Sequence, residues 1–298
     1  MFSRETRQTG STLRDPSPCD TAPVDSPKGH ARHGSEVGSG DGADRPVSPT
    51  PVVPDPPPAA RVVFGERVEL AVRFARYLAD TGITHGLIGP REVPRLWDRH
   101  ILNCAVVADE IESGASVIDV GSGAGLPGLA LAIARPDLMM TLIEPMERRT
   151  AWLDMVTADI GLDVTVVRAR AEEMHSRMTA DVVTARAVAP LDRLARWCLP
   201  LLPVGGRLVA MKGSSAEREI SEATATLQRL GGGKARIRLC GSLVLDDPTT
   251  VVVVDKVREG LPQGRGKTGT SSPSRANGSG HRNKRRSRTS PQERTAPD

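Results

Sequence analysis

A short run of glycines after an apolar segment carries the strongest chemical signal in the chain. Residues 117–128 read VIDVGSGAGLPG, so β-branched residues surround Asp119 and glycines follow at every second position. Such an apolar segment suits a fully covered parallel strand, and the glycines let the backbone turn sharply and approach a ligand closely. The run therefore predicts a nucleotide-type cofactor site, with a helix beginning at about Leu126. Its candidate residues are Asp119, Gly121, Ser122, Gly123, Gly125 and Leu126.

The glycine spacing alone leaves two cofactors open. Gly123, Gly125 and Gly128 satisfy the GxGxxG spacing of dinucleotide-binding proteins. However, Asp119 would repel a pyrophosphate, whereas S-adenosylmethionine has no phosphate and offers an ammonium group that a carboxylate can neutralise. The acid therefore favours S-adenosylmethionine, and a dinucleotide remains the alternative.

Acidic residues follow two later predicted strands. Ligands of open α/β sheets bind outside the carboxyl ends of the strands. Glu144 lies there, 23 residues beyond Gly121, at the spacing expected for binding the two ribose hydroxyls of an adenosine. Ala171 and Glu172 follow the third strand, where an acceptor could meet the exocyclic amine of adenine. The alternatives are a solvated acid at Glu144 and a helix-start acid at Glu172.

Cations at other positions predict contacts with the acceptor of the reaction. Arg186 ends the fourth predicted strand, Lys212 ends the fifth, and Arg99 and His100 lie in a helical pattern before the first. We predict that Arg186 and Lys212 act in catalysis and that all four residues contact phosphates or base edges of an RNA. Each also has an alternative interpretation as a solvated surface group.

The end of the fourth strand lacks the motif typical of amino-group methylation. Residues 186–190 read RAVAP rather than an N-P-P-Y-like or D-P-P-Y-like sequence, and no cysteine lies in a motif for attack on a pyrimidine. A ring nitrogen with a free lone pair, such as guanine N7, needs neither group. Catalysis would then consist of positioning and electrostatics.

Alternating strand and helix patterns must position these residues. They predict one α/β domain with a mainly parallel sheet over residues 61–257, including N-terminal helices within residues 66–112. The predicted strands are Ser116–Val120, Met140–Glu144, Val164–Ala169, Asp181–Arg186, Gly206–Lys212, Ala235–Leu239 and Thr250–Val257. The predicted helices are Arg67–Asp80, Pro94–Glu110, Leu126–Ala134, Arg148–Ile160, Leu191–Leu201 and Ala216–Leu230.

Composition separates this domain from both ends of the chain. Residues 1–60 hold eleven of the 24 prolines, and residues 258–298 are rich in Gly, Ser, Arg and Lys. We expect two disordered tails, because neither segment can bury enough apolar surface to offset its ordering entropy. The second tail carries a net charge of +7, against +4 for the whole chain. That charge indicates either attraction to nucleic acid or a solubilising role.

The sequence gives no indication of export, a membrane span or a metal site. The amino terminus has no apolar core, and no stretch approaches the length of a membrane span. The four cysteines lie far apart, without a CxxC pair or clustered histidines. This pattern is typical of reduced thiols rather than disulfides or metal ligands. We therefore expect a cytoplasmic protein without a bound metal.

Five segments of the domain together resemble one enzyme family. They are RHILN at residues 99–103, IDVGSGAGLPGLALAIARPD at 118–137, AEE at 171–173, TARA at 184–187 and AMKG at 210–213. Over about residues 62–257 the chain resembles the bacterial 16S ribosomal RNA guanine-N7 methyltransferase G family, also called glucose-inhibited division protein B. The LPG extension of the glycine turn is not generic to methyltransferases, and this makes the resemblance specific.

The resemblance implies a class I S-adenosylmethionine-dependent methyltransferase fold, which is Rossmann-like and mostly parallel. It implies methyl transfer to N7 of a guanine in the decoding-region hairpin of 16S ribosomal RNA, with the RNA or the small ribosomal subunit as partner. Gly121 and Leu126 would line the cofactor pocket, Ala171 and Glu172 would lie by the adenine, and Arg186 would lie beside the donor. Residues 86–91 (GLIGPR) replace an Asn-Leu-Thr segment of the family, which leaves substrate contacts by this loop open.

Three rival functions remain open. A small-molecule methyltransferase of the same fold would turn over a metabolite and ignore ribosomal RNA. A dinucleotide-dependent oxidoreductase would bind a nicotinamide cofactor. A noncatalytic RNA-binding module would lose its function on deletion of residues 258–298, whereas we expect that deletion to change only the association rate and its salt dependence.

Overall fold

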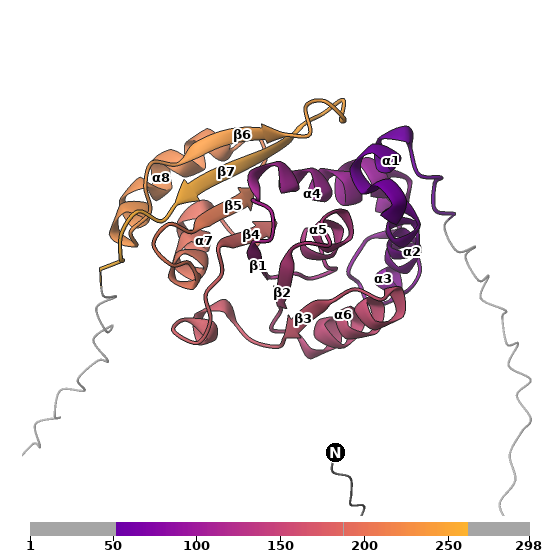
Figure 1. The fold of residues 1–298 in the computed structure, drawn as a ribbon, viewed down its shortest axis with the longest axis horizontal. Coiled ribbons are helices and arrows are strands. Elements are labelled where there is room, and N and C mark those ends of the chain that lie inside the picture. The colour runs from indigo at the N-terminus through magenta and orange to yellow at the C-terminus, as the bar shows by residue number, and fades with distance from the viewer. Residues whose placement is uncertain (1–51, 187, 262–298) are drawn as a thin grey trace, which may run out of the picture. The chain divides into compact units, whose positions relative to one another are not determined.

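The computed structural model describes residues 52–186 and 188–261, whose strands form one sheet in the order β3-β2-β1-β4-β5-β7-β6 (Figure 1). Strands β1 to β5 pair in parallel, and β7 runs antiparallel between β5 and β6. This reversed strand departs from the six-stranded dinucleotide-binding order. The strands are β1 (Ser116–Val120), β2 (Met139–Ile143), β3 (Val164–Val167), β4 (Val182–Arg186), β5 (Arg207–Met211), β6 (Arg236–Cys240) and β7 (Thr249–Asp255).

Helices cover both faces of the sheet, which explains why its central strands are nearly continuous apolar runs. Val117 of β1 and Val209 of β5 pack in the cluster that contains α5, while Ile118 and Leu208 pack with α7 and α8. Figure 1 shows α7 and α8 on one side and α1, α2, α4 and α5 on the other. The helices are α1 (Pro58–Phe64), α2 (Val68–Ala79), α3 (Thr81–Thr84), α4 (Asn103–Ala105), α5 (Gly128–Ala134), α6 (Glu147–Ile160), α7 (Leu191–Cys198) and α8 (Ala216–Arg229).

The structure confirms every predicted strand to within two residues at each end. The predicted helix over residues 94–110 is helical but changes its pitch several times. It consists of a 3₁₀ segment η2 (Pro90–Arg95), a π segment η3 (Leu96–Leu102), α4, and a second 3₁₀ segment η4 (Val106–Glu110). Two prolines in η2 lack the N–H that a continuous α-helix requires, which explains why this segment begins as a 3₁₀ helix.

The ends of the domain differ slightly from the prediction. α1 begins at Pro58, three residues before the predicted start of the domain. Trp97 Nε1 donates to the carbonyl of Pro54 at 2.9 Å, so the preceding residues also contact the domain. At the other end, the N–H of Leu261 donates to the carbonyl of Arg229 at 2.9 Å. Most of both predicted tails lies outside the described residues.

The start of α5 is packed closely against β1 and β2. The N–H of Gly128 donates to Asp119 Oδ2 at 3.1 Å. A Cβ atom on Gly128 would lie 2.3 Å from Leu142 Cδ2 and 2.8 Å from Asp119 Oδ2. Only a residue without a side chain therefore fits where the helix meets the sheet.

We expect Gly128→Ala to lower the free energy of unfolding by about 1–3 kcal/mol, because the new methyl group overpacks the contact with Leu142 and Asp119. Urea unfolding monitored by circular dichroism measures this change. Gly89→Ala is the matched control, because a Cβ atom there meets open space, and its effect should stay within about 0.5 kcal/mol. Equal stability of the two variants would contradict the packing argument.

Candidate active site

The glycine turn connects the end of β1 to the start of α5. Gly121, Gly123 and Gly125 have φ angles of 73°, 55° and 76°, which residues with side chains rarely adopt. The N–H groups of Gly121 and Ser122 donate to the carbonyl of Ile143 at 2.8 and 3.2 Å. The buried hydroxyl of Ser122 donates to the carbonyl of Asp119 at 3.0 Å. Ser122 therefore stabilises the turn from within, with its hydroxyl facing inward.

Glu144 closes the turn from the end of β2. Its side chain is 2% exposed, and Arg149 Nη1 lies 3.6 Å from Oε2. Oε2 accepts the N–H of Gly123 at 3.0 Å, and Oε1 accepts the N–H of Met146 at 3.0 Å. A carboxylate offers about four acceptor positions, so these two backbone bonds leave capacity for two ribose hydroxyls.

The turn fits S-adenosylmethionine better than a dinucleotide. In dinucleotide-binding proteins, the free N–H groups of such a turn bind the pyrophosphate. Here the N–H of Gly123 already binds the carboxylate of Glu144, and a second acid, Asp119, lies beneath the turn. A pyrophosphate would therefore meet negative charge, whereas a phosphate-free adenosine bearing a cationic sulfonium would not.

Asp119 is fully buried beneath the turn. Its Oδ1 atom and the Thr184 hydroxyl on the neighbouring strand have no hydrogen-bond partner within the described part of the chain. Burial raises the pKa of Asp119 to about 7, although hydrogen bonds from Ser122 and Gly128 oppose the rise. The side chain holds α5 in place, and its contact with the ammonium group of the cofactor stays a prediction.

The segment after β3 lies beside Glu144, whose N–H donates to the carbonyl of Val167 at 3.1 Å. A short 3₁₀ helix, η5 (Ala171–Met174), follows, with Ala171 buried and Glu172 exposed. Glu173 Oε2 accepts the N–H of Arg170 at 2.9 Å and caps this helix. Glu173 thus takes the capping role, while the predicted contacts of Ala171 and Glu172 with adenine stay predictions.

A cleft of about 850 Å³ lies beyond the carboxyl ends of β4 and β5. Arg99, Arg186 and Lys212 line it, so the structure brings three of the four predicted cations together. A second hollow of about 800 Å³ shares Arg99 and Asn103 with this cleft. The two hollows therefore adjoin along the segment that precedes β1, and Asp247 lines both of them.

Arg186 is held against this segment by two contacts. Its Nη1 lies 2.9 Å from Cys104 Sγ, and its Nη2 contacts His100 Nδ1. His100 is 8% exposed, and its Nε2 lies 2.7 Å from Glu92 Oε2. The structure thus places His100 behind Arg186 and away from the cleft surface, so the predicted contact of His100 with RNA would be indirect.

The amine of Lys212 is bound within the protein. Nζ donates to the carbonyl of Ala189 at 2.7 Å and lies 2.8 Å from Glu219 Oε2, and the side chain is 8% exposed. The same carboxylate accepts the N–H of Leu191 at 2.8 Å. Lys212 therefore ties the segment after β4 to α8. Its predicted roles in catalysis and RNA binding stay predictions, since both require the amine to leave this ion pair.

The sequence-based prediction missed Glu92, Cys104 and Glu219. Glu92 precedes His100 by eight residues, which a continuous α-helix would separate by about 12 Å. The change of pitch between η2 and η3 instead brings the two side chains together. Cys104 contacts Arg186 from 82 residues away. Glu219 contacts Lys212 from the next helix, α8. The sequence pattern of a single element does not reveal either pair.

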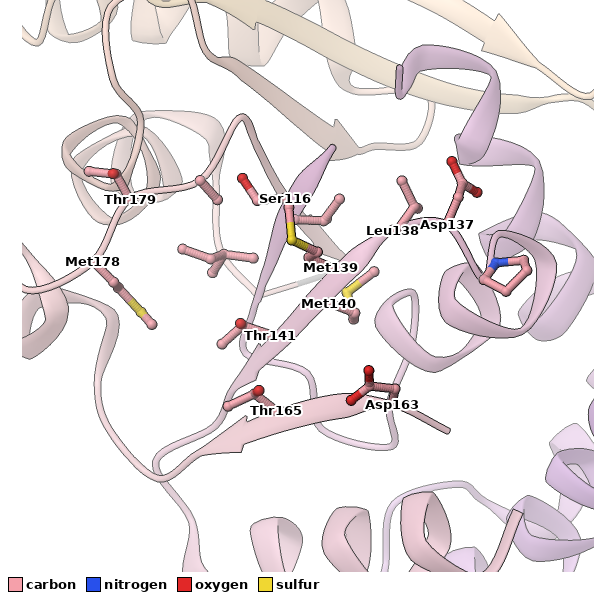
Figure 2. Close-up of a pocket in the computed structure, with 14 residues that line it drawn as sticks. Ser116, Asp137, Leu138, Met139, Met140, Thr141, Asp163, Thr165, Met178 and Thr179 are labelled. Carbon is pink, nitrogen blue, oxygen red and sulfur yellow. The ribbon is translucent and has the colours of Figure 1, made fainter. Parts of the chain in front are cut away.

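Another cavity, of about 400 Å³, lies at the opposite edge of the sheet (Figure 2). Ser116, Met139 and Thr165 line it near the starts of β1, β2 and β3. It contains none of the predicted site residues, which lie at the carboxyl ends as expected for an open α/β sheet.

Within residues 52–186 and 188–261, none of the helices has the length and apolar character that a membrane span requires. Nor do these residues place three His, Cys, Asp or Glu side chains where they could hold a metal ion.

The fold and the glycine turn define a class I S-adenosylmethionine-dependent methyltransferase. The profile of the family described as rRNA small subunit methyltransferase G matches residues 67–243. Relatives named ribosomal RNA small subunit methyltransferase G include proteins from Salinispora tropica and Rhodococcus jostii. The protein from Salinispora tropica is 56% identical over 226 residues, covering 72% of this chain and 93% of its own. That from Rhodococcus jostii is 58% identical over 202 residues, covering 67% and 89%. The chain therefore belongs to the rRNA small subunit methyltransferase G family.

We expect Asp119→Asn to change how stability depends on pH. The pKa of Asp119 is about 7 in the folded protein but about 3.9 in an unfolded chain. The folded wild type therefore holds an extra proton between about pH 4 and pH 7, and its free energy of unfolding falls as pH rises through that window. Because Asn does not titrate, the variant should gain about 2 kcal/mol relative to wild type between about pH 5 and pH 8.

Urea unfolding at both pH values measures this relative change. The exposed Asp154 offers the control variant Asp154→Asn. If Asp119→Asn and Asp154→Asn shift stability equally at the two pH values, the carboxyl of Asp119 does not titrate in this range.

Proposed function

We propose that this protein transfers a methyl group from S-adenosylmethionine to N7 of a guanine in the decoding-region hairpin of 16S ribosomal RNA. One observation carries the proposal: a glycine turn closed by Glu144 lies at the same sheet edge as a cleft lined by Arg186 and Arg99. Membership of the family supports small-subunit RNA as the acceptor.

The cofactor would lie across the carboxyl ends of β1, β2 and β3. When bound, it supplies a methyl group on a positively charged sulfonium. Residues 121–126 would contact its methionine part, and Glu144 would accept hydrogen bonds from both ribose hydroxyls. Ala171 and Glu172 would lie by the adenine. The buried carboxyl of Asp119, whose pKa is about 7 in the unliganded protein, would ionise more fully beside the cationic cofactor.

The acceptor guanine would enter the cleft unstacked from the RNA, as base-modifying enzymes require. Its N7 lone pair forms the new bond to the methyl carbon while the carbon–sulfur bond breaks, so no general base is needed. Positive charge then moves from sulfur to the base. The Arg186 guanidinium would not stabilise that cation, and we therefore assign it to the guanine O6 or to a phosphate.

The RNA strand would follow the two adjoining hollows along η2, η3 and α4. Exposed arginines at positions 91, 95 and 99 recur every fourth residue on this segment and would contact phosphates. Lys212 would join them only after leaving Glu219. A substrate of this kind assigns the reaction to the cytoplasm, on small-subunit RNA or the assembled subunit.

We expect the protein to transfer label from S-adenosylmethionine to small-subunit RNA from cells that lack the gene. Naked RNA, partial subunits and assembled subunits should each be tested. Chain cleavage at alkylated guanine then identifies the modified base. Absence of label from the RNA in every assembly state would refute the proposed function.

Arg186→Ala should lower RNA methylation by at least about 100-fold, as expected when one electrostatic contact to the reacting group is lost. Binding of S-adenosylmethionine, measured by calorimetry, should remain nearly unchanged. Arg218→Ala is the control, because that side chain is 75% exposed on α8. If Arg186→Ala abolishes cofactor binding and methylation together, Arg186 acts on the donor and not on the acceptor.

A further inference from the structure

Three side chains form a hydrogen-bonded series behind the cleft. Glu92 on η2 contacts His100 on η3, and His100 contacts Arg186 at the end of β4. Arg186 lines the cleft, His100 is 8% exposed, and the side chain of Glu92 is 32% exposed. This series therefore runs from the protein surface, through a buried imidazole, to the guanidinium that we propose contacts the acceptor.

The chemistry of these groups determines where the imidazole proton lies. Arginine has only donors, so His100 Nδ1 must accept from Arg186 and carries no proton. The proton of a neutral imidazole then resides on Nε2, from which it donates to the carboxylate of Glu92. His100 thus holds both partners only as the neutral Nε2–H tautomer.

The surroundings favour this neutral form. Burial lowers the pKa of His100 below its ordinary value, and the charges of Arg186 and Arg99 lower it further, while Glu92 opposes them. Cys104 on α4 also contacts Arg186, and burial raises the pKa of that thiol to about 11, so it stays protonated. Asp119 on β1 is a further titratable group nearby: its charge raises the pKa of Cys104, and the charge of Arg186 lowers the pKa of Asp119.

We propose that Glu92 and His100 are positioning residues, which orient the guanidinium of Arg186 toward the acceptor without touching RNA or cofactor themselves. The expected effect on catalysis rests on the proposed function, whereas the geometry rests on the hydrogen bonds alone. The guanidinium has five N–H donors. His100 and Cys104 bind its two terminal nitrogens from one side, which leaves other donors for the acceptor. If the guanidinium is already held in one orientation before the RNA binds, the entropic cost of ordering this long side chain is not added to the reaction barrier.

Acid should disrupt the contact between His100 and Arg186. Protonation of His100 places a proton on Nδ1, opposite the donors of Arg186, and turns an attraction into a repulsion between two cations. Arg186 then loses its fixed orientation. Because Glu92 raises the pKa of His100, removing the carboxylate charge should move this transition to lower pH.

Nuclear magnetic resonance of the ¹⁵N-labelled wild-type protein tests the geometry directly. Imidazole nitrogen shifts distinguish the two neutral tautomers, and the spectrum of His100→Asn identifies the signals of His100. We expect the Nε2–H tautomer near neutral pH, and in Glu92→Gln a pKa of His100 lower than in wild type. An Nδ1–H tautomer in the wild-type protein would overturn the proposal, whatever the enzyme does to RNA.

Two substitutions of His100 separate its two contacts. Asn carries an acceptor oxygen as many bonds from Cα as Nδ1, so His100→Asn can retain the contact with Arg186. Gln carries a donor at the position of Nε2, so His100→Gln can retain the contact with Glu92 but loses the contact with Arg186. We expect His100→Gln to lower kcat by about 10–100-fold, as for residues that support a functional group, and His100→Asn to lower it less.

Dissociation constants for S-adenosylmethionine and the KM for RNA should change less than about threefold in both variants, because the interaction acts on the chemical step. His85→Asn, on an exposed histidine, is the control and should leave kcat unchanged. If the Gln and Asn variants of His100 lose equal activity, or lose cofactor binding with it, His100 is not a positioning residue. If wild-type protein labels no RNA, the proposed function fails, while the tautomer measurement still decides the geometry.

Discussion

The hydrogen bond from the N–H of Gly128 to the buried carboxylate of Asp119 is the contact on which the site depends. It joins the end of β1 to the first turn of α5, where a free N–H group and the helix dipole both favour an acidic partner. The intervening residues must then close a tight loop, which accounts for three glycines with positive φ. This loop presents the N–H of Gly123 to Glu144. Strands β1 and β2 are thereby connected at the edge where a cofactor would lie.

The alternation of side chains along β4 explains why Arg186 lies on the same face of the sheet as Asp119. Residues two apart on a strand share a face. Thr184 pairs in register with Asp119, and Arg186 follows two residues later on that face. Arg186 therefore meets the helical segment that packs over α5, where His100 and Cys104 contact it. The residues that we propose for cofactor and acceptor thus come from one face of adjacent strands.

Sequence patterns predicted most of the fold because its strands are apolar, bounded by turns and separated by helices of ordinary length. The rule that ligands bind at carboxyl ends predicted where the candidate site lies, and the spacing of Glu144 from the glycines predicted a residue that does contact the glycine turn. Pairing between side chains of different elements was not predictable in this way. Glu219, seven residues after Lys212 and on another element, neutralises a cation that by sequence looked free. His100 looked like a surface residue, because the π segment that turns it inward has no sequence signature comparable to an amphipathic α-helix.

The reversed direction of β7 determines where the remainder of the chain is tethered. Because β7 runs opposite to β5, it ends beside the start of that strand, and the N–H of Lys256 donates to the carbonyl of Gly206 at 2.8 Å. The chain thus leaves the sheet at the end of the strands opposite the cleft, a strand length of about 17 Å away. Ending the chain after Leu261 would therefore remove no residue that lines the cleft or closes the glycine turn.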